Sequence, residues 1–275
     1  MTVSISSAPG LVEGRPGQKP RRWGSFYVAE HKVRGMRSYA QTVIVTTFGN
    51  PLLYLFGLGV GLAHLINAPV NGATYLQFVA PALLASAAVT VSANEFSYPV
   101  IAGFKWNAIF YGMNAAPISP TQIVNGFVLG VLVHMVPTVG VYYLFMLLFG
   151  AVASALGVLS ILTALLTGLS VGLIIMASMA RVEDDRGQPA LFQRFGVMPM
   201  FLFSGTFFPL SHLPIYLQWI GWISPLWHGT QLGRDLSYGM SEPAWLVVAH
   251  VVYLVAIGIL GWYLTVRTFT RRLNK

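Results

Sequence analysis

The sequence predicts an all-α polytopic membrane protein with six transmembrane helices, and three observations lead to this fold class. First, 55% of the 275 residues are hydrophobic and 9% are charged, whereas about a quarter of the residues in a soluble domain are charged. Second, long stretches without Asp, Glu, Lys or Arg follow Arg37, Lys105, Arg194 and Glu242. Third, the basic residues cluster between these stretches and at the chain ends. The composition excludes a single soluble domain and a disordered chain, and the absence of cysteine excludes a disulfide framework.

The charge-free stretches are divided into spans by their length, since a spanning helix needs roughly 20 mainly apolar residues. We expect spans 1, 2, 3, 4 and 6 at about residues 39–65, 74–94, 120–148, 154–180 and 243–266, with residues 67–72 separating the first two. Span 5, at about residues 195–209, is apolar but short. Pro209, Pro214 and Pro225 then divide the chain into pieces too short to cross. Residues 210–226 therefore predict a pair of short helices that dips into one face and returns.

The basic residues predict the orientation. If both chain ends are cytoplasmic, every one of the 16 Lys and Arg residues except Arg234 lies inside, and an odd number of spans would break this pattern. We therefore expect a multi-pass protein of the bacterial plasma (inner) membrane with cytoplasmic N- and C-termini. The formal charge of +8 is then a topology signal and a contact with anionic membrane lipid, and no nucleic-acid partner is expected.

The N-terminal segment divides into a tail and a helix. Residues 1–20 are rich in Ser, Pro and Gly and predict a disordered cytoplasmic tail, and no apolar stretch after Met1 indicates a cleaved signal peptide. Residues 21–38 alternate aromatic and charged side chains, which favours a helix along the cytoplasmic interface over a solvated run. The transmembrane domain then covers residues 39–268, and residues 269–275 form a cytoplasmic tail.

Two small-residue patterns lie inside predicted spans. Gly168, Ser170 and Gly172 match the G-x-S-x-G pattern of a catalytic nucleophile, but they lie mid-span without an acidic residue at that depth. The same spacing lets membrane helices approach closely, and Gly126 and Gly130 repeat it in span 3. We favour helix packing over an intramembrane Ser/His enzyme, so no catalytic residue is assigned.

The ionisable residues of the spans bear on the energy source. His134 and His250 are the histidines well inside spans, and a hydrogen-bonded structural role is favoured over a proton relay because neither span contains an acidic residue. No metal-binding cluster or P-loop motif occurs, so no metal site and no nucleotide hydrolysis are expected of this chain. Transporters driven by ion gradients keep charged residues at membrane depth. Energy supplied by another polypeptide is therefore favoured over an ATP-independent channel or carrier.

Two segments have specialised compositions. The elbow, residues 95–119, is unusually apolar and aromatic for a cytoplasmic loop, which favours docking on a partner protein over lying on lipid headgroups. The hairpin, residues 201–234, has prolines that bound short helices, and its Trp219, Trp222 and Trp227 suit the outer interface. The alternative for the hairpin is an amphipathic connecting loop.

Both segments resemble those of ABC-2-type permeases, the membrane subunits of ATP-binding-cassette exporters. The C-terminal signature of that family is similar to the hairpin at Ser204, Gly205, Phe208, Pro209, Leu213, Pro214, Pro225, Leu226 and Arg234. The family's ATPase-coupling elbow is similar at Glu95, Phe104, Lys105, Trp106, Asn107, Ile109 and Pro117, although many members carry more charge there. The resemblance covers nearly the whole chain after the tail. It extends to the branch that contains the nodulation lipo-oligosaccharide exporter and the daunorubicin-type drug-efflux permeases.

The resemblance implies a mechanism. Two permease subunits, identical or closely related, would pair, and each would sit on one of two separate ATPase subunits. The elbow would be the coupling helix, the hairpin the outer gate, and the small-residue faces would let helices slide. This chain would bind no cofactor, with ATP and Mg bound by the partner ATPase. An amphipathic cargo such as a lipo-oligosaccharide, a lipid-linked glycan or a lipophilic drug is implied.

Overall fold

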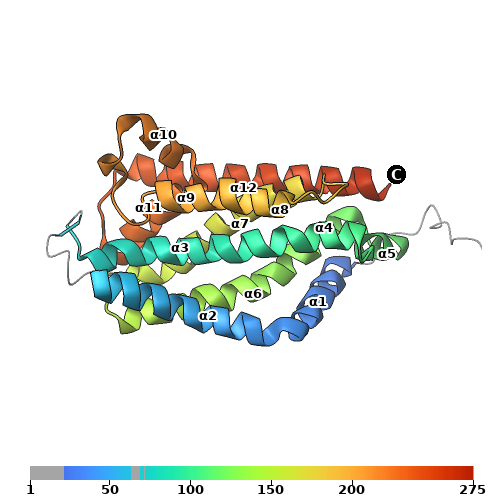
Figure 1. Cartoon of the computed structure of the whole chain (residues 1–275), viewed down its shortest axis with the longest axis horizontal. Helices are drawn as coiled ribbons and strands as arrows, with labels where there is room; N and C mark the ends of the chain where they lie inside the picture. The colour runs from blue at the N-terminus through green and yellow to red at the C-terminus, as the bar shows by residue number, and fades with distance from the viewer. Residues whose placement is uncertain (1–21, 63–68, 71, 275) are drawn as a thin grey trace, which may run out of the picture.

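The computed structural model describes residues 22–62, 69–70 and 72–274, with the backbone alone at residues 58–60, and these residues form an elongated bundle of helices (Figure 1). The predicted tail at residues 1–20, the end of predicted span 1 and half of the predicted break at residues 67–72 lie outside the described residues. The described part is helical apart from turns and one isolated bridge between Val70 and Ala73.

Four helices within the described residues are long and apolar enough to cross a membrane. They are Tyr75–Lys105, made of α3 (Tyr75–Phe96) and α4 (Tyr98–Lys105), then α6 (Pro120–Leu148), then Ala155–Met179, made of η4 (Ala155–Leu159) and α7 (Ser160–Met179), and α12 (Ala244–Leu273). These match predicted spans 2, 3, 4 and 6. The helix that matches predicted span 2 is longer than expected. We expected this span to end at Asn94, before the charge of Glu95, but that carboxylate is paired in the interior and the helix continues.

The other two predicted spans are composed of shorter pieces. Span 1 corresponds to α2 (Ala40–Tyr54), which runs directly into the π-helical segment η2 (Leu55–Gly61). The region of span 5 consists of α8 (Gln188–Phe192), the π-helical segment η5 (Gln193–Val197) and α9 (Met198–Phe203). The backbone therefore changes helical type within both segments, and neither is among the four long apolar helices.

Two of the long helices begin at residues whose side chains satisfy free backbone groups. Thr74 and Gln77 form a reciprocal capping box at the start of α3, and Ser119 and Gln122 form another at the start of α6. Pro120 follows the second cap, where its missing N–H costs nothing. These starts fix where the two helices leave their preceding loops.

The N-terminal helix α1 (Gly24–Met36) lies across α6 at one end of the bundle, and η1 (Arg37–Tyr39) joins it to α2 (Figure 1). The elbow helices α4 and α5 (Ile109–Ala115) and the C-terminus lie at the same end. Val28 of α1 is buried against the bundle, whereas Trp23, Phe26 and Tyr27 are exposed. The predicted interfacial helix thus has one packed face and one aromatic exposed face.

The opposite end of the bundle carries the hairpin helices. The segment η6 (Leu210–His212) and the short helix α10 (Ile215–Ile223) precede α11 (Pro225–Tyr238). We expected the paired short helices to end near Leu226, but the second one continues to Tyr238. This is because α11 is packed against α3, α7 and α12, so its backbone is covered by protein.

Candidate functional site

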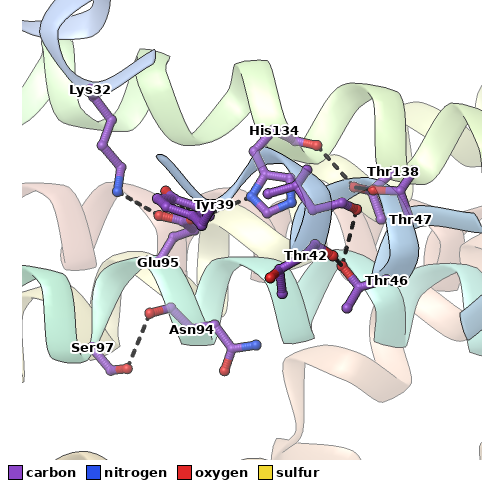
Figure 2. Close-up of polar contacts among 11 residues, drawn as sticks. Lys32, Tyr39, Thr42, Thr46, Thr47, Asn94, Glu95, Ser97, His134 and Thr138 are labelled. Atoms are coloured by element: carbon purple, nitrogen blue, oxygen red, sulfur yellow. Dashed lines mark hydrogen bonds and ion pairs between the residues drawn. The ribbon is translucent and has the colours of Figure 1, made fainter. Parts of the chain in front are cut away.

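A buried carboxylate joins three helices near the middle of the bundle. Lys32 Nζ of α1 lies 2.6 Å from Glu95 Oε2 of α3, and His134 Nδ1 of α6 lies 3.0 Å from Glu95 Oε1 (Figure 2). Tyr39 donates from its hydroxyl to Glu95 Oε1 at 3.3 Å. The side chains of Lys32, Glu95 and His134 are 13%, 7% and 12% exposed, so the pair is shielded from water. Glu95 was expected at the start of the coupling elbow, and its side chain lies inside the bundle.

The network continues from His134 toward α2. Thr138 Oγ1 donates to the His134 carbonyl at 3.0 Å, and the hydroxyls of Thr138 and Thr47 lie 3.1 Å apart (Figure 2). Hydrogen bonds and ion pairs therefore connect α1, α2, α3 and α6 within one layer. Because buried polar groups are costly when unpaired, this layer fixes how these helices are placed relative to one another.

A cavity of about 310 Å³ lies beside this network. Its walls come from α2, α3, α6, the η5–α9 segment and the start of α11. The polar lining side chains are uncharged apart from the titratable His134, and they are Thr46, Asn50, Tyr54, Ser86, Thr90, Asn94, His134, Thr138, Tyr142 and Gln193. Apolar side chains such as Leu83, Val197 and Phe201 complete the wall. The Tyr142 hydroxyl is buried and has no hydrogen-bond partner among the described residues.

The elbow has an exposed tip on a buried aromatic base. Lys105, Trp106 and Asn107 are exposed at the turn between α4 and α5, where Ala108 adopts a left-handed conformation with φ of 48°. The Trp106 ring is 47% exposed and lies 5.1 Å from the ring of Tyr98. This tip is the part of the elbow that another protein could contact.

The base of the elbow is packed against the ends of α6 and α12. The Phe104 ring lies 4.8 Å from the rings of both Phe110 and Phe269. The Arg272 guanidinium lies 4.2 Å from the centre of the Phe104 ring and donates to the carbonyls of Ala180 and Val182. Arg272 therefore caps the end of α7 while it contacts the elbow.

The elbow tip is also linked to the loop after α7, and two further elbow residues are partly covered. Lys105 Nζ lies 3.1 Å from Asp184 Oδ1, which links the tip to the loop after α7. Ile109 and Pro117 are half-buried. The expected elbow residues are thus divided among an exposed tip, a buried base and the interior carboxylate of Glu95.

The hairpin closes on itself through two serines. Ser204 Oγ lies 2.6 Å from Ser224 Oγ and also contacts the Met200 carbonyl, and both serines are buried. Gly205 follows with φ of 68°, a conformation that disfavours any side chain. Pro209 and Leu226 are buried, Phe208, Leu213 and Pro225 are half-buried, and Pro214 is exposed. The structure brings Ser204, Gly205 and Leu226 into the bundle and leaves α10 outermost.

Arg234 lies inside the bundle, with 2% of its surface exposed. Its guanidinium donates to the carbonyls of Phe78 at 3.1 Å and Gly205 at 2.7 Å, and to Gln231 Oε1 at 3.0 Å. The Phe78 ring centre is 3.6 Å from the guanidinium carbon. The residue that we counted as the single outer positive charge therefore holds the hairpin against α3 rather than facing water.

The small-residue patterns lie where helices come close together. A Cβ on Gly126 would lie 2.3 Å from the Ser25 carbonyl oxygen, and one on Gly130 would lie 2.6 Å from Lys32 Cγ, so both glycines receive α1. In α7, a Cβ on Gly168 would meet the backbone of α3, and a Cβ on Gly172 would meet the ring of Phe96, which also belongs to α3.

Ser170 joins the same small-residue face to α12. Its Oγ is buried and lies 2.7 Å from the Leu166 carbonyl and 2.8 Å from the Leu254 carbonyl. Both neighbours are backbone oxygens that only accept hydrogen bonds. This geometry links two helices and supplies no base for a nucleophile.

Several residues of these sites were not expected from the sequence. Lys32 was assigned to an interfacial helix, and His134 was given no acidic partner because none lies in its own span. The carboxylate comes from a different helix, so spacing along α6 could not reveal it. His250 contacts Glu242 at 3.1 Å, and this carboxylate lies just before the start of its own helix α12, outside predicted span 6. The described residues contain no group of three His, Asp or Glu side chains that could hold a metal ion.

The four long apolar helices place the chain among the polytopic membrane proteins. The sequence profile of the ABC-2 type transporter family matches residues 32–238. Nodulation protein J of Rhizobium meliloti (strain 1021) is 30% identical over 263 residues, which cover 91% of this chain and 92% of the relative. Nodulation protein J of Rhizobium leguminosarum bv. trifolii is 29% identical over 265 residues, with coverage of 91% and 92%. That of Bradyrhizobium diazoefficiens is 28% identical over 258 residues, with the same coverage.

The chain belongs to the ABC-2 type transporter family. It is therefore the membrane subunit of an ABC transporter, and its family implies an ABC ATPase as a partner. The expected family resemblance is confirmed, and it extends from the N-terminal helix to the end of α11.

Proposed function

We propose that this permease exports an amphipathic cargo, of the class of a lipo-oligosaccharide, a lipid-linked glycan or a lipophilic drug, across the bacterial plasma membrane. The observation that carries this proposal is the cavity of about 310 Å³ with hydroxyl and amide groups on apolar walls. A lining without Asp, Glu, Lys or Arg favours a cargo whose polar part is neutral and hydrogen-bonding. The unpaired Tyr142 hydroxyl supports the same conclusion, because a buried donor without a partner is costly unless a ligand or water pairs it.

Energy enters through the elbow tip. Trp106 and its exposed neighbours dock in a groove of the partner ATPase, which binds ATP and Mg, while this chain binds no cofactor and performs no catalysis. Two permease subunits, identical or closely related, assemble with two ATPase subunits. The exposed Trp106 of the tip supports a docking role because exposed aromatic side chains are typical of protein contacts.

The orientation follows from the ends of the bundle. The elbow, α1 and the C-terminus are at one end, which we assign to the cytoplasm together with most basic residues. The hairpin lies at the other end and acts as the outer gate. The proposed cargo path thus runs from the cavity toward Ser204, Ser224 and Arg234.

The test is cargo-stimulated ATP hydrolysis by the complex of permease and ATPase in nanodiscs. The panel contains fluorescent neutral glycolipids, zwitterionic phospholipids and a lipophilic cationic dye. We expect neutral glycolipids to stimulate hydrolysis, and Tyr142→Phe to raise the half-maximal glycolipid concentration about tenfold. Tyr263→Phe, at an exposed position on α12, is the matched control.

Two outcomes would contradict the proposal. Equal stimulation in wild type and Tyr142→Phe would remove the cavity from the cargo path. Transport of the same glycolipids into liposomes by the purified chain alone, without ATPase or ATP, would instead support an ATP-independent carrier.

A further inference from the structure

A second buried polar cluster lies at the hairpin end, away from the cavity. His228 Nδ1 of α11 lies 2.7 Å from His250 Nδ1 of α12. The far nitrogen of each ring has another partner: His228 Nε2 lies 3.0 Å from the Trp222 carbonyl, and His250 Nε2 lies 3.1 Å from Glu242 Oε2. His250 is fully buried, His228 is 9% exposed, and the Glu242 side chain is 10% exposed. The three side chains form one linear chain of contacts.

The row of contacts from the Trp222 carbonyl through the two histidines to Glu242 needs one additional proton. The Trp222 carbonyl can only accept, so His228 Nε2 carries a hydrogen. If His228 is neutral, its Nδ1 accepts, and His250 Nδ1 must donate. A neutral His250 would then turn a lone pair toward the carboxylate of Glu242, and two acceptors would face each other. Every contact is satisfied only when the two histidines and Glu242 together hold one proton more than two neutral rings and a carboxylate.

The proton can occupy any of three positions without breaking the chain. It can reside on His250, on His228, or on the Glu242 carboxyl, and in each case every contact of the cluster pairs one donor with one acceptor. Without it, one of the two short contacts becomes a repulsive pair of acceptors. The geometry therefore binds a proton rather than a metal, whose ligands would all point their lone pairs at one centre.

The cluster fastens the hairpin to α12. Trp222 belongs to α10, His228 to α11 and His250 to α12, while Glu242 precedes the start of α12. The Trp227 ring packs at 5.0 Å against both imidazoles. The ring of Tyr253 stacks at 4.0 Å on His228, and its hydroxyl donates to the Ile223 carbonyl at the end of α10.

The charged and titratable groups around the cluster come from each neighbouring helix. Glu242 also accepts from Gln231 at 2.6 Å, and Gln231 in turn accepts from Arg234. Tyr238 on α11, Tyr75 on α3 and Tyr253 on α12 are the other titratable neighbours of this region, and α7 contributes none. Burial of the cluster opposes the extra positive charge, whereas Glu242 favours it. The proton is required because each contact of the cluster needs one donor and one acceptor.

We propose that His228, His250 and Glu242 form a proton-binding site that holds the α10–α11 hairpin closed on α12. Loss of the proton as pH rises loosens the hairpin. The assignment of this site to the outer face rests on the proposed orientation. The proposed proton binding does not depend on that orientation. It senses the pH of the compartment that the hairpin faces.

Glu242→Gln is the variant that separates the proton from the packing. A glutamine can accept from Gln231 through its oxygen and donate to His250 Nε2 through its nitrogen. Every contact in the chain is then satisfied with two neutral imidazoles, and no additional proton is needed. His212→Gln, at an exposed position of the same hairpin, is the matched control.

The experiment uses the purified full chain in nanodiscs, without ATPase or cargo, and follows backbone hydrogen exchange of α10 from mildly acidic to mildly alkaline pH. After correction for intrinsic exchange, we expect protection of α10 in wild type and His212→Gln to fall about tenfold or more as pH rises. Protection in Glu242→Gln should be high and constant. Because neither cargo nor ATPase is present, failure of this proposal is distinguishable from failure of the export proposal.

A second measurement does not depend on the variant folding. Side-chain ¹⁵N NMR of histidine-labelled wild type reads the protonation of the ring nitrogens directly. We expect three hydrogens on the four ring nitrogens of His228 and His250, or a protonated Glu242 carboxyl, at the acidic end of the range. Two neutral imidazoles with an ionised Glu242 at every pH, or a pH dependence that persists in Glu242→Gln, would overturn the proposal.

Discussion

The pair of Lys32 and Glu95 should contribute strongly to stability because it is shielded from water. Glu95→Gln leaves the Lys32 ammonium, in a side chain 13% exposed, without its carboxylate. Breaking a buried ion pair from one side costs about 3–5 kcal/mol, and we expect about 3 kcal/mol here because the retained amide keeps contacts to its neighbours. Lys32→Met removes the charge from the other side. In the double variant no unpaired charge remains, so it should be about 2 kcal/mol more stable than the sum of the single effects predicts.

The assay is a double-mutant cycle of unfolding free energies for the purified chain in mixed micelles. The chain contains a matched control on the same helix: Arg34 and Glu30 form an ion pair of the same 2.6 Å length, but their side chains are 71% and 40% exposed. Solvent screening should reduce that coupling to about 0.5 kcal/mol or less. If the Lys32–Glu95 coupling were no larger than that of the exposed pair, the argument that burial makes this contact hold α1 to the bundle would be refuted.

Further substitutions test the elbow, the helix contacts and the hairpin. Trp106→Ala should abolish stimulation of the partner ATPase without changing permease stability. Trp219→Ala, at a similarly exposed ring, should leave this stimulation unchanged. Equal ATPase stimulation by the two variants would contradict docking at the tip. Gly168→Ala should lower the unfolding free energy by about 1–3 kcal/mol because its Cβ would lie 2.8 Å from a methionine sulfur. Gly140→Ala, with nothing within 4 Å, should be neutral or stabilising by up to about 1 kcal/mol. Arg234→Met should cost about 3 kcal/mol or more, since three buried acceptors lose their donor; denaturant titrations showing unchanged stability would remove its role in holding the hairpin.

The sequence predicted the spans best where capping and turn residues bound a charge-free segment. The helix α6 begins at Pro120 and ends at Leu148, as expected, because a capping box precedes it and a glycine with positive φ follows it. The prediction of span 2 was wrong in length because a charge was treated as a boundary. Glu95 is compensated by Lys32 and His134 from other helices, and such long-range pairing is not encoded in the hydropathy of one segment.

The candidate sites depended even more on contacts between distant residues. The elbow was recognisable from its exposed aromatic residues, since such side chains at a tight turn have a local sequence signal. Arg234 had no such signal: its partners Phe78 and Gly205 are 156 and 29 residues away in the chain. Arg234 was expected only as the one outer positive charge and as a member of the hairpin signature, and the fold shows that its donors satisfy two backbone carbonyls.

The length of the α3–α4 helix gives the elbow a direct connection to the cavity. Tyr75–Lys105 forms one span, so the exposed tip after Lys105 and the cavity-lining Ser86, Thr90 and Asn94 belong to the same nearly continuous rod. Glu95 lies between them and holds this rod to α1 and α6. The helix is interrupted at Ser97, whose backbone is not helical (φ −95°, ψ −93°), so a displacement of the tip by the ATPase would reach the cavity wall through this bend, two residues after the Glu95 contacts. Ala102→Gly, next to the existing Gly103, would loosen α4 below the tip, and it should uncouple ATP hydrolysis from transport while leaving ATPase binding intact.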